Sequence, residues 1–419
     1  MKHLLILVSL SILGGLLILF SHFESVQSEN TKPQLWQIRS VDTMKNSRDK
    51  ARAELFNNEY DEHIEKELKA IKGTGANYVA LGTPYDEEFM PYLLRWVKLA
   101  RKNDLKIWFR GNWSSWEGWF DYPKNLTPQQ HIQKTDAFIR SNPSLFRDGD
   151  IFDACPECEN AGYWKQPEKN AEYNIFVRQM YESNKKAFIA IDRDVSSNLQ
   201  AIIGGRAKEV LDRETLQSLG DVVAIDHYVK SPEVMQEFID YFAAQNTKVV
   251  ISEFGAPVPG INPSMSEEEQ ATFVKTIFDV LYAKKASVMG VNYYVSMVGT
   301  TPLLNDDFTP RIAYQVVKNY YSPLIIKGSV INSLGDRMKD ITIATEDGRS
   351  TVQTNGRGEY AMATPQGKQV IRGGSGEYTE QVYGIHSSDP SKTIIQNFVV
   401  DPRKPGLLYR LRSFFSKIF

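Results

Sequence analysis

The chain has 419 residues, of which 42% are hydrophobic and 24% are charged, close to the average for packed globular proteins. This composition excludes a wholly disordered chain and provides enough apolar side chains for a substantial core. Lys and Arg number 49 against 51 for Asp and Glu, giving a formal net charge of -2, so no overall basic field favours a nucleic-acid partner. At roughly 150 residues per domain, the length predicts two or three domains.

An uncharged, mostly apolar run occupies residues 4–23, directly after Lys2 and His3. Its length lies between the core of a signal peptide and the roughly 20 apolar residues of a bilayer span. Because Val26-Gln27-Ser28 offers a small-residue cleavage site, a cleaved signal peptide and an uncleaved membrane anchor both stay open for residues 1–30. The positive charge before the run and Glu24 after it predict an exported chain: extracellular, periplasmic, or membrane-anchored and facing outward.

Residues 31–322 alternate short β-rich runs with longer amphipathic stretches. The strand candidates are residues 35–41, 77–81, 106–109, 150–154, 199–203, 222–225, 248–251 and 290–294. Helical patterns include residues 62–71, 87–102, 128–139, 171–189, 232–244 and 267–283. Alternating strands and helices imply a parallel sheet. Eight repeats predict an α/β fold of the (β/α)8 TIM-barrel type, and the rival open sheet lacks a Gly-rich dinucleotide fingerprint after the first strand.

Residues 323–401 have a different pattern, with short alternating runs separated by turn dipeptides such as Asp347-Gly348 and Asn355-Gly356. The strand candidates are residues 325–331, 341–345, 350–353, 359–363, 368–371 and 393–399. This pattern predicts a small C-terminal all-β sandwich domain. Gly328-Ser-Val-Ile and the stretch 354–360, Thr-Asn-Gly-Arg-Gly-Glu-Tyr, resemble carboxypeptidase-regulatory-like sandwich modules, which are often appended to secreted enzymes.

Residues 402–419 form a basic amphipathic tail. Apolar side chains recur at helical spacing, at Leu407, Leu408, Leu411, Phe414, Phe415, Ile418 and Phe419. Basic side chains flank them, at Arg403, Lys404, Arg410, Arg412 and Lys417. This pattern is typical of a helix on a membrane surface, and a helix packed on the protein's own surface fits it equally well. Contact with a membrane surface through this tail and through the N-terminal segment is therefore one interpretation.

The two cysteines, Cys155 and Cys158, are three residues apart. In an oxidising compartment they can close a short disulfide loop and brace the chain around Glu157. A zinc site is not expected, because four ligands are usual and the six His show no matching spacing. A thioredoxin-like redox role ranks lower, since the surrounding pattern is not thioredoxin-like.

Carboxylates follow two of the predicted strands, and the carboxyl ends of barrel strands meet on one face. The seventh strand ends in Ser252-Glu253-Phe254-Gly255, and the fourth leads into Cys-Pro-Glu157-Cys-Glu159. Two acids across one cleft can cleave a glycosidic bond. A separation of about 5 to 5.5 Å gives retention of configuration, and one of about 6.5 to 9.5 Å admits a water molecule and gives inversion.

On these strand ends, residues 35–321 resemble the (β/α)8 clan of retaining glycoside hydrolases that includes cellulases and β-mannanases. The resemblance implies that Glu253, followed by an aromatic residue and Gly255, is the nucleophile. It also implies an acid/base Glu at the end of strand four, usually preceded by Asn. Here Pro156 precedes Glu157 and Cys158 precedes Glu159, so the usual Asn is missing at both positions and the assignment is ambiguous. Counting from the strand core at Ile151 makes Glu157 the first candidate and Glu159 the second.

The same resemblance extends to aromatic side chains. Strand six ends in Asp226-His227-Tyr228, which is similar to the clan's His-x-Tyr pattern, and implies that His227 or Tyr228 contacts the nucleophile and substrate. Strand eight ends in Tyr293-Tyr294. Alternation favours Tyr294 as the aromatic platform under the sugar, and a one-residue slip would exchange it with Tyr293.

The loop after strand three adds a basic and several aromatic side chains. Arg110 is expected to pair with Glu253, and Trp113, Trp116 and Trp119 to line sugar subsites. Packing within the loop or core is the alternative for these Trp residues.

The sequence therefore predicts an exported retaining glycoside hydrolase, endo-acting on a β-linked polysaccharide, that needs no metal or organic cofactor. Polysaccharides or oligosaccharides are the expected partners. The alternative is a non-catalytic protein of the cell envelope that binds polysaccharide with a glycosidase-like barrel.

Overall fold

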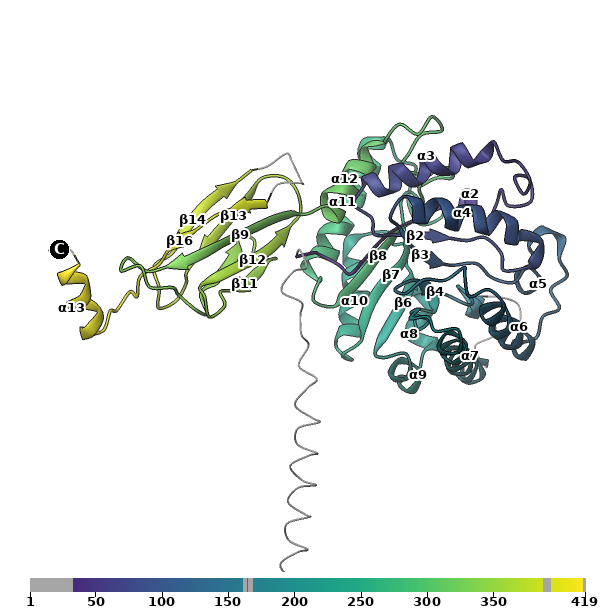
Figure 1. Ribbon diagram of the computed structural model, residues 1–419, viewed down its shortest axis with the longest axis horizontal. Helices are drawn as coiled ribbons and strands as arrows, with labels where there is room; N and C mark the ends of the chain where they lie inside the picture. The colour runs from purple at the N-terminus through teal and green to yellow at the C-terminus, as the bar shows by residue number, and fades with distance from the viewer. Residues whose placement is uncertain (1–32, 161–163, 165–168, 387–392, 417–419) are drawn as a thin grey trace, which may run out of the picture. The chain divides into compact units, whose positions relative to one another are not determined.

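The computed structural model describes residues 33–160, 164, 169–386 and 393–416 (Figure 1). Residues 34–419 form one compact unit, which is separate from residues 1–33. The signal or anchor predicted for residues 1–30 lies outside the described residues. Within the described ranges, no helix combines the length and hydrophobicity needed to cross a bilayer.

Eight parallel strands follow one another around a barrel, in the order β4-β3-β2-β1-β8-β7-β6-β5. The strands are β1 (Ile38–Asp42), β2 (Tyr78–Leu81), β3 (Lys106–Phe109), β4 (Ile151–Phe152), β5 (Ala201–Ile203), β6 (Val222–Asp226), β7 (Lys248–Phe254) and β8 (Val288–Tyr293). Every neighbouring pair is parallel. The predicted (β/α)8 barrel is confirmed.

The barrel closes between β4 and the segment that precedes β5. Ile151 and Ser196 form a parallel bridge, and the amide of Phe152 donates to the carbonyl of Ser196 at 2.8 Å. The amide of Gly149 donates to the carbonyl of Asp194 at 2.7 Å. β4 has only two residues where the sequence pattern predicted five, so much of this closure depends on chain outside the regular strands.

The helices surround the strands of the barrel (Figure 1). They are α2 (Met44–Ser47), α3 (Tyr60–Gly73), α4 (Met90–Lys102), α5 (Ser114–Glu117), α6 (Pro128–Ser141), α7 (Asn170–Ala190), α8 (Gly204–Val210), α9 (Arg213–Ser218), α10 (Pro232–Ala243), α11 (Glu267–Ala283) and α12 (Ile312–Tyr321), with 3-10 turns η1 (Glu87–Phe89), η2 (Trp119–Asp121) and η3 (Cys158–Asn160). The local sequence determines where two of these helices begin. Capping boxes satisfy free amides at the N-termini of α6 and α11, and they are formed by Thr127 with Gln130 and by Ser266 with Glu269.

Two apolar layers follow from the alternation of side chains along each strand. One set fills the barrel interior and includes Ile38, Tyr78, Ala80, Trp108, Ile151, Leu199, Val222, Ala224 and Val250. The other set, which includes Phe109, Phe152, Val223 and Ile251, packs against the helices. The interior set shows which alternate residues of each strand point toward the barrel axis.

The C-terminal region forms two small, mainly antiparallel sheets, in agreement with the predicted all-β module. One has the order β11-β10-β13-β14, and the other contains β12, β9 and β15, with β16 also pairing with β9. The strands are β9 (Leu324–Ile331), β10 (Thr342–Thr345), β11 (Thr351–Gln353), β12 (Glu359–Thr364), β13 (Gln369–Gly373), β14 (Gln381–Ile385), β15 (Thr393–Ile395) and β16 (Phe398–Val399). β14 was not predicted. The likeness to carboxypeptidase-regulatory-like modules stays a prediction.

Replacing a buried aromatic residue of the barrel should destabilise it far more than replacing an exposed one. Phe109 is fully buried, with ring centroids 5.1 Å from Phe146 and 6.2 Å from Phe152. Phe109→Ala is expected to lower the free energy of unfolding by about 3 to 5 kcal/mol, measured by urea denaturation. The control Phe56→Ala, at a side chain 81% exposed, should change it by less than about 0.5 kcal/mol. Similar losses for both variants would contradict this packing.

Candidate active site

A cavity of about 390 Å³ opens at the carboxyl ends of the barrel strands. Its wall is formed by Met44, Arg48, Arg110, Glu117, Trp119, Pro156, Glu157, Asn160, Asp226, Tyr228, Glu253 and Tyr294. Four carboxylates and three aromatic rings therefore face one space. This is the face on which active sites of (β/α)8 barrels are found.

Glu253 reaches the cavity because of an irregularity in β7. Strict alternation would group it with Ile251, which packs against the helices. The pairing of β6 with β7 shifts after Ile225, so that Asp226 lies opposite Glu253 and Ser252 is the extra residue. Such a bulge redirects the side chain that follows it. The strand thereby presents Glu253 at the cavity.

Gly255 allows two segments of the chain to approach closely at this end of the barrel. A Cβ at this position would overlap the carbonyl oxygen of Tyr294. The absence of a side chain lets the chain after β7 lie against the end of β8. Glu253 and Tyr294 are thus brought to the same wall of the cavity.

Both oxygens of the Glu253 carboxyl group have a partner. The Tyr228 hydroxyl donates to Oε2 at 2.5 Å, and Oε1 lies 3.2 Å from the Arg110 guanidinium. Burial, with the charge of Asp226 next, raises the pKa of Glu253, whereas Arg110 and Tyr228 lower it. The residue is 8% exposed, so the carboxyl is fixed in orientation but still borders the cavity.

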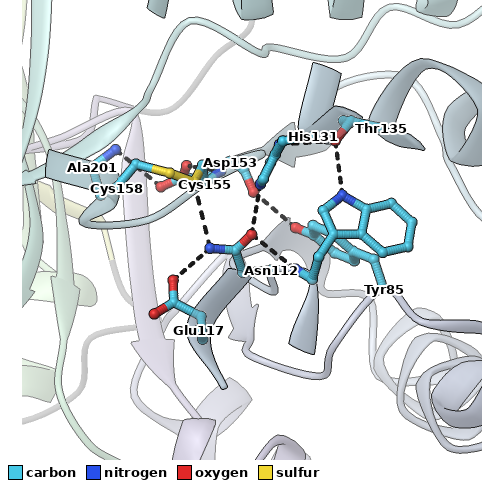
Figure 2. The surroundings of a disulfide bond; sticks show 10 residues. Tyr85, Asn112, Glu117, His131, Thr135, Asp153, Cys155, Cys158 and Ala201 are labelled. Carbon is cyan, nitrogen blue, oxygen red and sulfur yellow. Dashed lines mark hydrogen bonds between the residues drawn. A yellow bond between two sulfur atoms is a disulfide. The ribbon is translucent and has the colours of Figure 1, made fainter. Parts of the chain in front are cut away.

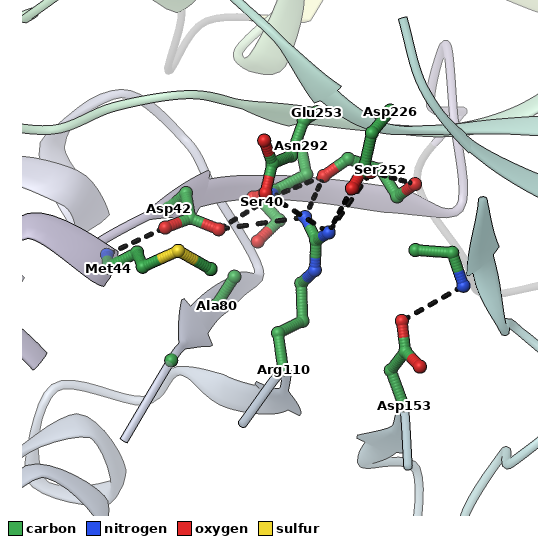
Figure 3. A network of polar contacts seen from close by, with 12 residues as sticks. Ser40, Asp42, Met44, Ala80, Arg110, Asp153, Asp226, Ser252, Glu253 and Asn292 are labelled. Atoms are coloured by element: carbon green, nitrogen blue, oxygen red, sulfur yellow. Dashed lines mark hydrogen bonds and ion pairs between the residues drawn. The ribbon is translucent and has the colours of Figure 1, made fainter. Parts of the chain in front are cut away.

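Arg110, just after β3, is the centre of a polar network (Figure 3). Its fully buried guanidinium donates to both oxygens of Asp226, at 3.0 and 2.8 Å, and to the carbonyl of Ser252. It also lies 3.7 Å from the carboxyl of Asp42. These carboxylates and that of Glu253 outweigh the effect of burial and raise the pKa of Arg110 further, so the cation is permanent.

Glu157 enters the same cavity from the loop after β4. Its backbone has φ of 52°, in the left-handed region, and its amide donates to the carbonyl of Ala201 at 2.8 Å. Burial is the first cause that raises the pKa of its carboxyl, followed by the negative charges of Asp226 and Glu253. The environment of Glu157 therefore favours the protonated form, while the positive charge of Arg110 and the hydroxyl donor of Tyr228 act toward the ionised form of Glu253.

Figure 2 shows the disulfide between Cys155 and Cys158. By position in the chain, this bond closes a short loop that contains Glu157. The carboxylate of Asp153 accepts from the amides of Cys155 and Ala201, at 3.2 and 3.0 Å, and so ties this loop to β5. The left-handed conformation of Glu157 is costly for a residue with a side chain and needs support from its surroundings. The cross-link and Asp153 provide that support.

Glu159, the second candidate for the acid/base, lies elsewhere. It is 1% exposed, and its Oε1 accepts from the amide of Ile203 at 2.7 Å. Burial raises the pKa of its carboxyl to about 8. Its carboxyl joins the loop to the end of β5 and is outside the wall of the cavity.

Of the predicted aromatic residues, Tyr228, Trp119 and Tyr294 line the cavity. The rings of Tyr228 and Tyr294 meet edge to face, with centroids 6.0 Å apart. Tyr293 points the other way: it is fully buried and its hydroxyl donates to the carbonyl of Thr301 at 3.0 Å. The alternation that favoured Tyr294 over Tyr293 thus gives the observed arrangement.

Trp113, Trp116 and His227 pack away from the cavity. The Trp113 indole donates to the hydroxyl of Thr135 at 3.0 Å, and Trp116 stacks on Phe176 with centroids 5.9 Å apart. Both Trp residues are 5% exposed and join the core between strands and helices. The packing alternative is therefore the observed one for these two residues.

His227 lies among the helices, where its ring contacts Phe238 at 4.4 Å between centroids. Burial, with Lys208 nearby, lowers the pKa of His227 to about 4, so the ring is neutral at ordinary pH. Asp226 occupies the inward position in its place. On β6, Val222 and Ala224 face the barrel interior, and Asp226 continues this period of two.

Asp226, Glu117 and Arg48 are cavity residues that the sequence motifs did not reveal. The inward direction of Asp226 could have been predicted from the alternation of side chains along β6, in which Val222 and Ala224 face the barrel interior. Glu117 and Arg48 lie on loop and short-helix segments without a regular period. Arg48 pairs with Asp49 at 2.8 Å, and its guanidinium lies 4.8 Å from the centre of the Trp119 ring.

His131, Cys155 and Cys158 are the group of potential metal ligands that the described residues bring together, with ligand atoms within 4.8 Å of one another. The two sulfurs are bonded to each other, and a ring nitrogen of His131 is 2.8 Å from the Asn112 amide oxygen. Asn112 also donates to the Cys155 sulfur at 3.4 Å. The cluster is thus engaged in bracing the Glu157 loop (Figure 2).

No protein-family model matches the sequence, and no curated protein matches it. Similar solved structures include an FMN-binding β-glucuronidase from Facaelibacterium prausnitzii L2-6, at 13% identity and a TM-score of 0.48, covering 86% of this chain and 57% of that chain. The Ignisphaera aggregans GH53 catalytic domain gives 15% identity and 0.48, covering 68% and 97%. The GH113 β-mannanase of Alicyclobacillus acidocaldarius gives 13% and 0.45, covering 70% and 98%.

These structures are glycoside hydrolases by name, and their similarity to this chain is remote. The chain spans little more than half the length of the β-glucuronidase. The strand order and the closure of the barrel define this chain as a (β/α)8-barrel protein. Its barrel has a cavity lined by carboxylates at the carboxyl ends of the strands.

Removing the cross-link should cost a modest amount of stability. The Cys155–Cys158 loop spans only four residues, for which loop-closure entropy gives about 2 kcal/mol. The double variant Cys155→Ser with Cys158→Ser is expected to lower the free energy of unfolding by this amount in urea denaturation. Adding a reductant should have the same effect on the parent protein and none on the variant. An unchanged denaturation midpoint would contradict a bracing role.

Proposed function

We propose that this protein is a retaining glycoside hydrolase in which Glu253 is the nucleophile and Glu157 the acid/base. The observation that carries the proposal is the contrast between two carboxyl groups in one cavity. The charge of Arg110 and the Tyr228 hydroxyl donor oppose the rise that burial causes in the pKa of Glu253. Among the described residues Glu157 has no such hydroxyl donor, and burial with negative neighbours raises its pKa and favours its protonated form. Retaining glycoside hydrolysis requires a pair of carboxyl groups, one of them ionised and the other protonated.

In the first step the Glu253 carboxylate attacks the anomeric carbon. The bond from that carbon to the leaving oxygen breaks, and the oxygen takes the proton of Glu157. In the second step the Glu157 carboxylate takes a proton from water, whose oxygen displaces Glu253 and releases the sugar. Arg110 supplies a positive charge beside Glu253, which stabilises the negative charge that the Glu253 carboxylate regains as it leaves the sugar.

The test is covalent labelling with 2-deoxy-2-fluoro glycosides that carry an activated leaving group. A panel of gluco, manno, xylo and galacto probes covers the common sugars. Peptide mass spectrometry should find stoichiometric attachment at Glu253, and the Glu253→Gln variant should take no label. If no probe attaches to the folded protein, the proposal fails and a polysaccharide-binding role gains support.

Replacing the acid/base should produce a rescuable defect. Glu157→Gln is expected to lower kcat/KM on unactivated substrates by about 10² to 10⁴-fold, with added azide restoring turnover of an activated aryl glycoside. The matched control is Glu159→Gln, which changes a buried carboxyl two residues away that is outside the cavity wall. Azide rescue of Glu159→Gln rather than Glu157→Gln would reverse the assignment.

The pH dependence of kcat/KM should shift in opposite directions for two variants. Activity needs ionised Glu253 and protonated Glu157. The charge of Asp226 raises both pKa values, so Asp226→Asn should move both limbs of the profile to lower pH. The Tyr228 donor lowers the pKa of Glu253, so Tyr228→Phe should move the acidic limb to higher pH. Shifts of the same sign in both variants would contradict these roles.

For the substrate we propose a β-linked polysaccharide cleaved internally. Trp119, Tyr228 and Tyr294 support a sugar ligand, since aromatic faces pack against pyranose rings. The resemblance of the strand ends to cellulases and β-mannanases supports the β linkage. A hydrolysis screen over β-glucans, mannans, xylans and bacterial exopolysaccharides tests it, because internal cleavage lowers viscosity before reducing sugars accumulate.

We also propose that the protein acts outside the cytoplasm. The apolar run at residues 4–23, preceded by Lys2, supports export or an outward-facing anchor. The mass of the mature N-terminus distinguishes a cleaved signal peptide from a retained anchor.

A further inference from the structure

The C-terminal helix α13 (Leu407–Phe415) has an apolar face that is exposed. Its large apolar side chains are 46 to 79% exposed, at Leu407, Leu408, Leu411, Phe414 and Phe415. At 3.6 residues per turn, all five fall within an arc of roughly 120°. Arg410 and Arg412 border this arc on its two sides. Exposed apolar side chains gathered in this way mark an interaction surface.

The contacts of α13 with the β module use its polar face. The Arg412 guanidinium donates to both carboxylate oxygens of Asp336, at 3.0 and 2.9 Å. The Tyr409 hydroxyl donates to the carboxylate of Asp401 and lies 3.2 Å from the hydroxyl of Ser333. Asp336 and Ser333 belong to the turn after β9. The polar side of the helix is therefore the side that is docked.

This arrangement separates the two interpretations of the tail. A helix packed on its own protein would bury its apolar face and leave its charges in water. Here Tyr409 and Arg412 hold the helix to the module, and no residue of α13 is buried. The apolar face is thus left for an external occupant.

Charge identifies the kind of occupant. Arg403, Lys404 and Arg410 lie on or just before the helix without a carboxylate salt bridge among the described residues, in contrast to Arg412. Arg403 and Arg410 donate instead to backbone carbonyls, of Tyr378 and Pro405. An apolar face with cationic flanks is the pattern of a helix that lies in the interface of an anionic bilayer.

We propose that α13 docks on the surface of a membrane that contains anionic lipids, with Leu407, Leu411 and Phe415 near the middle of the inserted face. The module would then be held at the bilayer by its C-terminal end, independently of any anchor at residues 4–23. This inference goes beyond the proposed hydrolysis and does not depend on it.

The test places a fluorophore on each face of the helix in the full chain. Because the two natural cysteines are joined to each other, a single introduced cysteine can be labelled selectively. Leu411→Cys carries the environment-sensitive nitrobenzoxadiazole group on the apolar face, and Ser413→Cys carries it on the polar face as the matched control. Both proteins are mixed with phosphatidylcholine vesicles, with or without phosphatidylglycerol.

The emission at position 411 should increase several-fold and shift to shorter wavelength only with phosphatidylglycerol, and high salt should weaken the response. Position 413 should respond little. Residues 4–23 are identical in all samples, so their own insertion cannot produce this difference. The triple variant Arg403→Gln, Lys404→Gln and Arg410→Gln, which keeps the Arg412–Asp336 contact, should weaken partitioning by roughly a hundredfold.

Four results would overturn the proposal. They are no response at 411 with anionic vesicles, an equal response on phosphatidylcholine alone, equal responses at 411 and 413, and a concentration-dependent response without vesicles. The last would assign the apolar face to a second copy of the chain.

Discussion

The buried guanidinium of Arg110 joins three strand ends of the barrel by charge. Asp42 from β1, Asp226 from β6 and Glu253 from β7 all face this one cation. Three carboxylates so close would repel one another, and burial alone would leave them protonated. A cation that stays charged without solvent opposes both effects, although burial still raises the pKa of each of the three carboxyls. Loss of one partner from a buried ion pair costs about 3 to 5 kcal/mol. The geometry around Glu253 is therefore a consequence of where Arg110 lies.

The two acids of the cavity are supported in different ways. Glu253 belongs to a seven-residue strand, and its carboxyl accepts a hydrogen bond from Tyr228 and forms an ion pair with Arg110. Glu157 lies in a loop in left-handed conformation, held by a disulfide and by Asp153. A nucleophile must stay ionised and aligned, whereas an acid/base group gains a proton and loses it in each cycle. The strand position of Glu253 and its contacts with Arg110 and Tyr228 suit the first of these proposed roles, and the loop with negative neighbours suits the second.

The barrel could be predicted from sequence, because it follows from alternating strand and helix patterns, and the candidate acids could be predicted from the strand ends. Glu253 and Glu157 were found in this way, and both line the cavity. Motif likeness drew attention to His227, whereas the period of two along β6 points Asp226 inward. In a regular strand the period of two would point Glu253 away from the barrel interior. The bulge in β7 turns it inward, and this bulge depends on pairing with β6, so the local sequence of β7 does not predict it.

Loop residues were harder to predict for a related reason. Trp113 and Trp116 share a short sequence with Trp119, yet only Trp119 lines the cavity. Their directions are set by partners from distant parts of the chain, such as Thr135 and Phe176. A regular strand fixes side-chain direction by alternation, and an irregular loop has no equivalent rule.

The closure of the barrel has a consequence for its internal motion. Strands β4 and β5 meet through a two-residue strand, a single bridge and a few amide contacts, and the Glu157 loop is part of that seam through Ala201. Sub-global opening begins where the fewest contacts must break, so amide protons along 149–157 and 194–203 should exchange with deuterium together and earlier than those of β7. Such opening would then displace Glu157 while Glu253 stays in place.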